Sequence, residues 1–380
     1  MTEKSLKVMT ILGTRPEIIR LSRIISLLDE YTRHILVHTG QNYDYELNEV
    51  FFKDLNLRKP DYFLNVNTTT LGNVYGDTII KSEKIMVEEK PDALLILGDT
   101  NSAIAAIIAK RLRIPIFHME AGNRGFDLNV PEEINRKIID HISDFNLAYN
   151  DHARRHLLAE GLPHRRIYLT GSPLYEVLVN NREKIDASTI LRRNKLKSKN
   201  YFVMSIHREE NVDNPVHLEK ICHIINQIAE KYNKPVIIST HPRTRKRLDS
   251  FAKKIKFHPQ VKFFKPFGFF DYVKLQKNAL CTISDSGTIS EESAILSFPA
   301  ITIRNSIERP EALDAGTILL TGLDADTVLD SIELVMEEHK LGIEKKIPAE
   351  YQIADTSWRV VKLIIGTAKL SNQWSGINPK

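Results

Sequence analysis

The chain has 380 residues, of which 42% are hydrophobic and 27% charged, and its formal net charge is +5. This length fits two domains of ordinary size, and the composition is typical of a globular protein. Basic blocks with interleaved aromatic residues, which would indicate nucleic-acid binding, are missing, and no apolar stretch approaches the ~20 residues of a membrane-spanning helix.

Through the first half of the chain, short runs rich in Val and Ile alternate with amphipathic helical patterns. The expected strands cover residues 8–12, 35–37, 93–97, 114–117, 146–149 and 167–169. Helical patterns lie between them, for example at residues 18–28 and 102–112. Strands that are buried on both faces and separated by helices predict a parallel sheet with helical crossovers.

The alternation pauses at residues 177–199, a stretch dense in Lys, Arg and Asn, and then restarts. The second set of strands is expected at residues 201–205, 236–239, 261–264, 280–284 and 300–303, with helices at 217–232 and 289–296 among them. We therefore predict an α/β fold of two Rossmann-like domains, residues 1–175 and 176–355, that face each other across a cleft. Ligands of such sheets bind beyond the carboxyl ends of the strands.

The first strand runs into Gly13-Thr14-Arg15-Pro16-Glu17 at the start of the first helix. Glycine permits a tight turn, proline suits the first helical turn, and an arginine beside a helix N-terminus favours anion binding. A plain turn with a surface arginine is the alternative. The segment is neither a Gly-x-Gly-x-x-Gly dinucleotide fingerprint nor a phosphate-binding loop that ends in Gly-Lys-Ser/Thr.

Acidic residues follow two consecutive strands of the first domain. Asp99 comes after one strand, and Glu120 comes after the next. Glu132 and Glu133 then lie at the expected start of a helix, where stabilisation of the helix dipole is the usual explanation for an acidic pair. Three acidic positions that converge on one edge of a sheet instead favour acid–base chemistry.

The second domain offers groups suited to a nucleotide. His207 and Arg208 follow its first strand and could contact a phosphate or shuttle a proton, although a lone histidine there is more often structural. Ser286 and Gly287 open a helix whose free N–H groups can hold a phosphate, with a plain N-cap by the serine as the alternative. Glu292 lies about one turn into that helix and suits ribose hydroxyls, and Arg309 adds positive charge beyond the next strand.

Taken together, these motifs resemble those of the non-hydrolysing UDP-N-acetylglucosamine 2-epimerase family, which shares the two-domain fold of many nucleotide-sugar glycosyltransferases, the glycosyltransferase-B fold. The motifs are Gly-Thr-Arg-Pro-Glu, Gly-Asp-Thr, Glu-Ala-Gly, Pro-Glu-Glu-x-Asn-Arg, His-Arg, Asp-Ser-Gly and Glu-Arg-Pro-Glu, in order from Gly13 to Gly316. Each is modest alone, but the ordered set is specific. The resemblance also implies a C-terminal segment, residues 356–380, whose helix at 357–370 packs back on the first domain.

The resemblance implies roles for individual residues. Those near UDP are Arg15, Ser286, Gly287 and Arg309 at the diphosphate or nucleotide, Glu292 at the ribose, and Phe267 and Tyr272 near the uracil. Those around the sugar and its leaving group are Asp99, Glu120, Glu132 and His207. The implied reaction removes the C2 proton as UDP leaves, forms a glycal, and returns UDP with protonation of C2 from the opposite face. It uses no redox cofactor and no metal.

The sequence departs from the family pattern at several positions. Arg20 replaces a lysine of the first helix, which keeps the charge but changes the hydrogen-bond geometry. Glu209 stands where a second arginine usually follows His-Arg, and Thr288 replaces the second glycine of Ser-Gly-Gly. We keep Arg20 and Thr288 among the expected substrate-binding residues. The stretch from Glu120 to Glu132 is also shorter than in the N-acetylglucosamine enzymes.

These departures resemble the branch that acts on 2,6-dideoxy L-sugars. The implied reaction converts UDP-2-acetamido-2,6-dideoxy-L-talose to UDP-N-acetyl-L-fucosamine for surface polysaccharide, with UDP-N-acetylglucosamine as the alternative substrate. Phe126, Leu128 and Val130 would then form an apolar wall for the C6 methyl group, unless they merely pack under a loop. Many bacterial relatives are activated by UDP-N-acetylglucosamine at a second site, but the acidic Asp44 at that position predicts no such activation here.

Other functions stay open at this point. A glycosyltransferase of the same fold would need an acceptor pocket, a hydrolysing epimerase would release the free sugar, and a nucleotide-sugar sensor would need no convergent carboxylates. We expect a homodimer in the cytoplasm. Cys222 and Cys281 each lie in an apolar run, which favours free thiols in a reducing compartment, and the N-terminus lacks a signal-peptide pattern.

Overall fold

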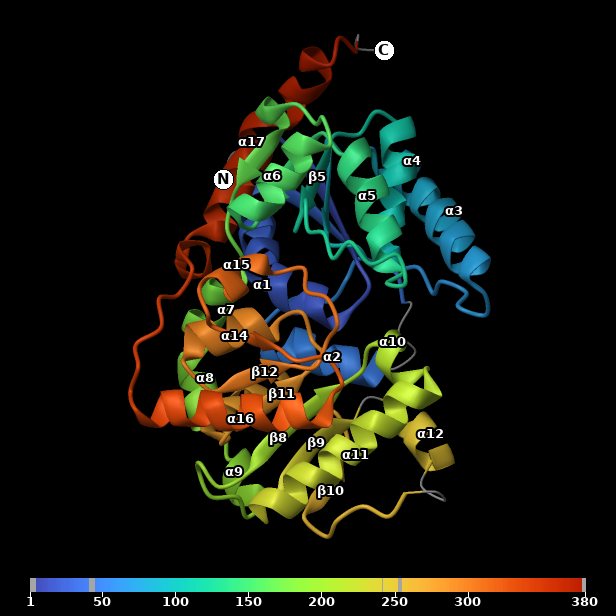
Figure 1. Cartoon of the computed structure of the whole chain (residues 1–380). Coiled ribbons are helices and arrows are strands. Elements are labelled where there is room, and N and C mark those ends of the chain that lie inside the picture. Colours follow the sequence, from blue (N-terminus) through green and yellow to red (C-terminus); the bar gives the residue numbers. More distant parts are fainter. Residues whose placement is uncertain (1–4, 41–44, 241, 252–254, 378–380) are drawn as a thin grey trace. The chain divides into compact units, whose positions relative to one another are not determined.

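The computed structural model describes residues 5–40, 45–240, 242–251 and 255–377, which form two compact units (Figure 1). Unit 1 comprises Met1–Leu178 and Ile353–Lys380, and unit 2 comprises Val179–Gln352. The chain therefore passes between the units after residues 178 and 352, whereas we expected boundaries after residues 175 and 355. Asp44, on which the expectation of no activation by UDP-N-acetylglucosamine rests, lies outside the described residues.

Unit 1 is built on a seven-stranded parallel sheet with strand order β3-β2-β1-β4-β5-β6-β7. The strands are β1 (Lys7–Leu12), β2 (Arg33–His38), β3 (Tyr62–Phe63), β4 (Ala93–Leu97), β5 (Ile116–Met119), β6 (Phe145–Ala148) and β7 (Ile167–Leu169). Strands β4, β5 and β6 are buried along their whole length, as a parallel sheet with helices on both faces requires. The predicted parallel α/β architecture is confirmed in this unit.

The helices of unit 1 cover both faces of this sheet. They are α1 (Arg15–Tyr31), α2 (Tyr45–Asp54), α3 (Leu71–Glu89), η1 (Asn101–Ile104), α4 (Ala105–Arg111), α5 (Glu132–Ile142), α6 (Asp151–Ala159), η2 (His164–Arg166), α7 (Leu174–Asn180) and α17 (Thr356–Trp374). Alternate residues of β1 and β4 point to one face and join a buried cluster with the alanines of α4. These packed layers hold the strand ends in fixed positions.

The C-terminal helix α17, red in Figure 1, belongs to unit 1. It packs on α1, where the rings of Tyr31 and Trp358 lie 5.5 Å apart. At its start, Thr356 Oγ1 donates to Thr170 O at 3.1 Å, and Ser357 N donates to the buried Glu176 at 2.9 Å. These hydrogen bonds satisfy polar groups at a helix start that is fully buried.

Unit 2 is built on a six-stranded parallel sheet with strand order β10-β9-β8-β11-β12-β13. The strands are β8 (Phe202–Ile206), β9 (Val236–Thr240), β10 (Val261–Phe264), β11 (Thr282–Ser284), β12 (Ala300–Thr302) and β13 (Leu319–Leu320). The helices are α8 (Arg182–Ala187), α9 (Ile190–Arg193), α10 (Glu209–Val212), α11 (Pro215–Tyr232), α12 (Pro242–Phe251), α13 (Phe269–Asn278), α14 (Ile289–Leu296), α15 (Pro310–Asp314), α16 (Ala325–Lys340) and η3 (Ala349–Gln352). The main core lies between this sheet and helices α11 and α16.

Some elements differ from the sequence-based expectation. The helix expected at 102–112 is divided into the 3-10 turn η1 and the helix α4. The stretch 177–199, expected only as a pause, contains α8 and α9. Strands β3 and β13 were missed because each pairs over only two residues at an edge of its sheet, which leaves no periodic pattern.

Cys222 and Cys281 are buried free thiols, as expected. Burial raises the pKa of Cys222 to about 11 and that of Cys281 to about 12. Within the described part of the chain, no helix combines the length and apolar character needed to cross a bilayer.

Candidate active site

In unit 1 the strand order reverses between β1 and β4, and such a switch point is where ligands bind to open α/β sheets. Glu17, in the first turn of α1, connects the loops that follow these two strands. Its carboxylate accepts hydrogen bonds from Gly13 N at 3.1 Å, Ser102 Oγ at 2.6 Å and Thr100 Oγ1 at 3.2 Å. Burial raises the pKa of Glu17, although these hydrogen bonds oppose the rise. No role was predicted for Glu17 from the sequence, but the structure makes it a connection between the two loops.

Asp99 lies in the loop after β4 and is held by α5. Arg136 donates to Asp99 Oδ2 from Nη2 at 2.5 Å and from Nε at 3.1 Å, and it also pairs with the buried Glu133. Asn135 Nδ2 donates to the backbone oxygen of Asp99 at 2.9 Å. Arg136 had no role predicted from the sequence, although its place one turn after Glu132 puts the two residues on one helix face.

Glu120 lies directly after β5 and has a backbone φ of +64°, in the left-handed region. Its carboxylate pairs with Arg20 of α1, and Asn123 Nδ2 approaches it at 3.4 Å. A Cβ atom added to Gly98 would lie 3.2 Å from Glu120 Oε2, so this carboxylate stands beside the residue that precedes Asp99. The structure therefore places Asp99, Glu120 and Arg20 at one edge of the sheet.

Glu132 is the first residue of α5 and is half-buried. Burial raises the pKa of Tyr75, and the nearby charge of Glu132 adds to this rise. Tyr75 Oη donates to Asn135 Oδ1 at 2.5 Å, and the same Asn135 side chain donates to the backbone of Asp99. Glu132 is thus connected through its neighbours to the Asp99 loop.

Arg15 is the first residue of α1, at the carboxyl edge of β1. It is half-buried, and its guanidinium carbon lies 5.7 Å from the centre of the Phe51 ring. The position suits the anion-binding role expected from the sequence, because the N–H groups of the first helical turn point to the same edge.

The loop between Glu120 and α5 exposes two apolar side chains. Phe126 is 73% exposed and Leu128 is 72% exposed, whereas Val130 is 2% exposed. Val130 is therefore packed under the loop, whereas Phe126 and Leu128 are not. Gly125 N donates to Glu133 Oε2 at 3.1 Å, which ties this loop to the ion pair of Arg136.

In unit 2 the strand order reverses between β8 and β11, and Asp285 lies directly after β11. It is fully buried, and its carboxylate accepts from His207 N and Arg208 N at 3.1 Å and from Asn211 Nδ2 at 3.1 Å. The His207 imidazole lies 3.1 Å away. Burial by itself would raise the pKa of Asp285, but His207 and these hydrogen bonds lower it to about 2. Asp285 belongs to the Asp-Ser-Gly motif, but this positioning role was not predicted from the sequence.

The loop that follows Asp285 combines small and hydroxylated residues with an arginine. Ser286 Oγ and Thr288 Oγ1 lie 3.0 Å apart, and a Cβ atom added to Gly287 would lie 3.6 Å from Arg208 Nη2. The absence of a side chain at Gly287 therefore leaves this guanidinium close to the backbone. Arg208, for which the sequence allowed a phosphate contact, lies beside the predicted phosphate-binding residues, which suits recognition of an anion.

Three other predicted nucleotide contacts lie together in unit 2. Gln276 Nε2 donates to Glu292 Oε2 at 2.7 Å, and Phe267 and Tyr272 pack against the same small core cluster. Burial raises the pKa of Tyr272, and the charge of Glu292 adds to the rise. The residues expected at the ribose and the uracil are therefore neighbours, although they come from different segments.

Arg309 is 2% exposed, and its Nε lies 3.5 Å from Oε1 of Glu291, which is fully buried. Glu291 directly precedes Glu292 in α14. The structure thus places Arg309 against the helix that follows the Ser286 loop.

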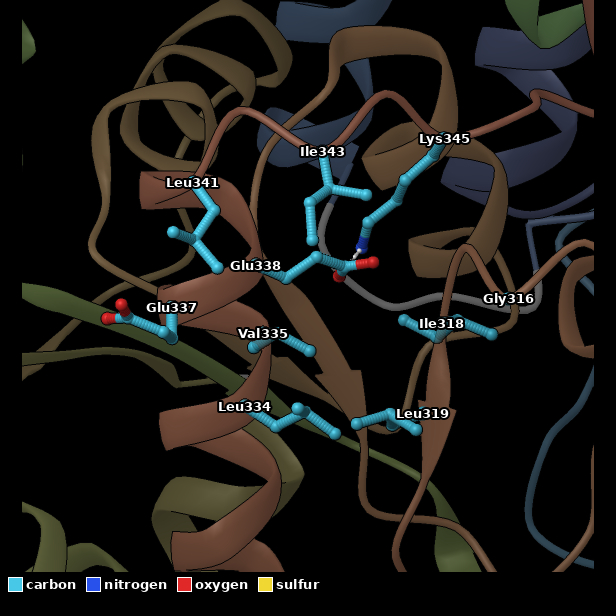
Figure 2. Close-up of a pocket in the computed structure, with 10 residues that line it drawn as sticks. All are labelled: Gly316, Ile318, Leu319, Leu334, Val335, Glu337, Glu338, Leu341, Ile343 and Lys345. Carbon is cyan, nitrogen blue, oxygen red and sulfur yellow. Dashed lines mark ion pairs between the residues drawn. The ribbon is translucent and has the colours of Figure 1, made fainter.

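A separate hollow of about 360 Å³ lies between β13 and the C-terminal half of α16 (Figure 2). Its apolar lining consists of Ile318, Leu319, Leu334, Val335, Leu341 and Ile343. Lys345 points across it to Glu338, at 2.6 Å. None of the predicted site residues lines this hollow. Among the described residues, no group of three or more His, Cys, Asp or Glu side chains is arranged to hold a metal ion.

Comparison with known proteins decides the family. Residues 28–365 match the model of the family described as "UDP-N-acetylglucosamine 2-epimerase". The chain belongs to this family. It is therefore a UDP-sugar 2-epimerase, an isomerase that binds a UDP-sugar substrate.

Individual relatives of this epimerase agree with the match. The UDP-N-acetylglucosamine 2-epimerase structure from Rickettsia bellii is 46% identical, covers 98% of this chain and 100% of its own, and has a TM-score of 0.91. That from Methanocaldococcus jannaschii, in complex with UDP-GlcNAc and UDP, is 36% identical with coverages of 95% and 100% and a TM-score of 0.89. A UDP-2,3-diacetamido-2,3-dideoxy-D-glucuronate 2-epimerase from Pseudomonas aeruginosa is 32% identical over 86% of this chain and 91% of the relative. The predicted family and two-domain fold are confirmed.

Proposed function

We propose that this epimerase inverts C2 of a UDP-2-acetamido sugar by elimination and re-addition of UDP. One carboxylate takes the C2 proton while the bond between C1 and the diphosphate oxygen breaks, and UDP leaves with the electron pair. UDP then attacks C1 of the glycal, and C2 is protonated from the opposite face. The supporting observation is the group of Asp99, Glu120 and Glu132 at one edge of the unit 1 sheet, where Arg136 and Arg20 compensate two of the negative charges.

In this proposal unit 2 holds the nucleotide. The loop from Ser286 to Thr288 and the guanidinium of Arg208 surround a position suited to the diphosphate, while Glu292 takes the ribose. Asp285 fixes the backbone at His207 and thereby the direction of both His207 and Arg208. Arg15 and Arg309 are proposed to add positive charge for the leaving diphosphate.

The first experiment tests the chemistry. Turnover in deuterated water should place deuterium at C2 of the product, because the proton that returns comes from solvent-exchanged groups. Asp99→Asn, Glu120→Gln and Glu132→Gln should each lower kcat by about 10²–10⁴-fold while UDP binding persists. Asp151→Asn, at a partly exposed residue in the first turn of α6 that pairs with Arg155, is the control and should keep the normal rate. Retention of the original hydrogen at C2, or near-normal rates in all three acid variants, would refute the proposal.

We further propose UDP-2-acetamido-2,6-dideoxy-L-talose as the substrate and UDP-N-acetyl-L-fucosamine as the product. The supporting observation is the exposure of Phe126 and Leu128 on a loop that is tied to the acid cluster through Glu133. An apolar wall favours a C6 methyl group, whereas a C6 hydroxyl placed there would lack a hydrogen-bond partner. UDP-N-acetylglucosamine is the second candidate substrate, because the Rickettsia and Methanocaldococcus proteins are named UDP-N-acetylglucosamine 2-epimerases.

A side-by-side assay separates the two substrates. The 6-deoxy substrate should give the higher kcat/KM, and the reverse reaction should also run. Phe126→Ser and Leu128→Ser should reduce this preference, whereas Leu158→Ser, which changes an exposed leucine of α6 in the same unit, should not. A preference of the wild-type enzyme for UDP-N-acetylglucosamine would overturn the substrate assignment and leave the family assignment intact.

A further inference from the structure

A series of buried charged groups lies beneath the Glu120 loop in unit 1. Asp140, in the last turns of α5, is fully buried and accepts from Gly122 N at 3.2 and 3.1 Å and from Arg124 Nη1 at 2.7 Å. Arg124, itself 2% exposed, donates to both carboxylate oxygens of Glu160 at 2.7 and 2.6 Å. The Arg124 guanidinium holds the pKa of Glu160 at about 2. No step of the proposed reaction uses these groups directly.

The backbone that Asp140 holds adopts an unusual conformation. Glu120 has a φ of +64° and Gly122 a φ of +82°, and a side chain at residue 122 would meet Ala153 O at 2.3 Å. A left-handed conformation is unfavourable for glutamate and persists only where its surroundings impose it. The hydrogen bonds from Gly122 N to Asp140 supply such a constraint two residues after the carboxylate that is proposed to react.

His118 links Asp140 to the second acid loop. The imidazole is fully buried, its Nε2 lies 2.9 Å from Gly98 O, and its Nδ1 lies 3.0 Å from Asp140 Oδ1. The Gly98 carbonyl oxygen can only accept, so Nε2 is the donor in this hydrogen bond. Gly98 directly precedes Asp99 and stands beside the Glu120 carboxylate.

Helix α5 carries all three connections at a four-residue spacing. Glu132 is one of the acids, Arg136 pairs with Asp99, and Asp140 holds the loop of Glu120. Residues four apart lie on one side of a helix, one turn above another. A single rigid helix therefore sets the positions of all three acids relative to each other.

We propose that Asp140 and His118 are positioning residues of the reaction: Asp140 holds the loop of Glu120, and His118 contacts both Asp140 and the backbone before Asp99. This inference rests on the proposed catalytic role of Glu120. Arg124 compensates the negative charge of the buried Asp140, as a buried ion requires, and it also pairs with Glu160.

The contribution of His118 is tested by substitution. His118→Gln removes the imidazole that lies between Asp140 and the backbone before Asp99, and it should lower kcat with KM and UDP affinity unchanged. An unchanged kcat in this variant would overturn the positioning role of His118.

The positioning role is tested by kinetics with a matched control. Asp140→Asn should lower kcat by about 10²-fold, as expected for a misplaced catalytic group, with KM and UDP affinity unchanged. Asp144→Asn is the control, because Asp144 is also buried and also binds a backbone N–H and a cation, Ile116 N at 3.0 Å and Lys110 at 2.7 Å, but at the amino ends of the strands. It should lose thermal stability without this loss of kcat.

The outcomes separate the inference from the proposed function. Equal losses of kcat in Asp140→Asn and Asp144→Asn, or an equal loss of UDP affinity, would reduce Asp140 to a purely structural residue and overturn the inference. A Glu120→Gln enzyme with full activity would instead refute the proposed site. Asp140→Glu, which keeps the charge, should recover more of the kcat than Asp140→Asn.

Discussion

Asp285→Asn should remove the main constraint on the loop after β8. The carboxylate of Asp285 is fully buried and accepts from two consecutive backbone N–H groups, those of His207 and Arg208, and from Asn211. An amide of the same shape carries no charge, and its NH₂ group would face donors instead of acceptors. Both the stability of unit 2 and its affinity for the nucleotide should therefore fall.

The pKa of Asp285 gives the magnitude. It lies at about 2 rather than the ordinary 3.8, because His207 and the hydrogen bonds outweigh the effect of burial. At about 1.4 kcal/mol per pH unit, this difference corresponds to about 2 kcal/mol. Because the folded state has the lower pKa, the contribution is fully present above 3.8 and is lost as the pH falls through about 2. Asp285→Asn should thus lower the free energy of unfolding by about 2 kcal/mol at neutral pH, and by less as the pH falls below 3.8.

Urea unfolding at several pH values measures this difference, and hydrogen exchange of the β8 and β11 amides localises it to unit 2. Calorimetric titration with UDP should show weaker binding. Asp324→Asn is the control: Asp324 caps α16 from an exposed position, and asparagine caps a helix equally well. If Asp285→Asn is as stable as this control at neutral pH, or if its deficit does not shrink in acid, the reasoning is wrong.

Two further predictions concern unit 1. Gly122→Ala should destabilise the protein far more than Gly161→Ala: both glycines have a φ near +80°, but an added Cβ meets Ala153 O at 2.3 Å at residue 122 and nothing within 4 Å at residue 161. Gly161→Ala should lower the free energy of unfolding by about 1–2 kcal/mol because of its backbone conformation alone. Similar melting temperatures for the two variants would contradict the close contact between residue 122 and Ala153. Glu17→Gln should flatten the pH dependence of stability: burial raises the pKa of Glu17 above 4.5, so the wild-type protein should lose stability as the pH rises through the folded value. Urea unfolding at pH values below and above 4.5 measures this dependence. If the free energy of unfolding changes with pH equally in the wild-type protein and in Glu17→Gln, the raised pKa of Glu17 is contradicted.

Much of this fold could be read from the amino-acid sequence. Apolar runs between helical patterns placed most strands to within two residues, and residues 93–97, 167–169 and 261–264 were found with their full bounds. The pause near residue 177 marked where the chain passes into unit 2. The ordered motifs at the strand ends indicated the family, and the family match over residues 28–365 confirms it. Strand periodicity is local, so the sequence determines it without knowledge of the sheet order.

Only the tertiary structure decided which side chains meet at the sheet edges. Arg20 pairs with Glu120, 100 residues later, and Glu17 binds Ser102, 85 residues later. The sequence marked Glu120 as the end of a strand, but its partner depends on which strands are neighbours and how α1 is rotated against them. The same holds for His118, which lies in a buried strand and shows a function only once Gly98 O and Asp140 are seen on its two sides. Such contacts join segments brought together by sheet order and helix packing, and neither is encoded in any local pattern of residues.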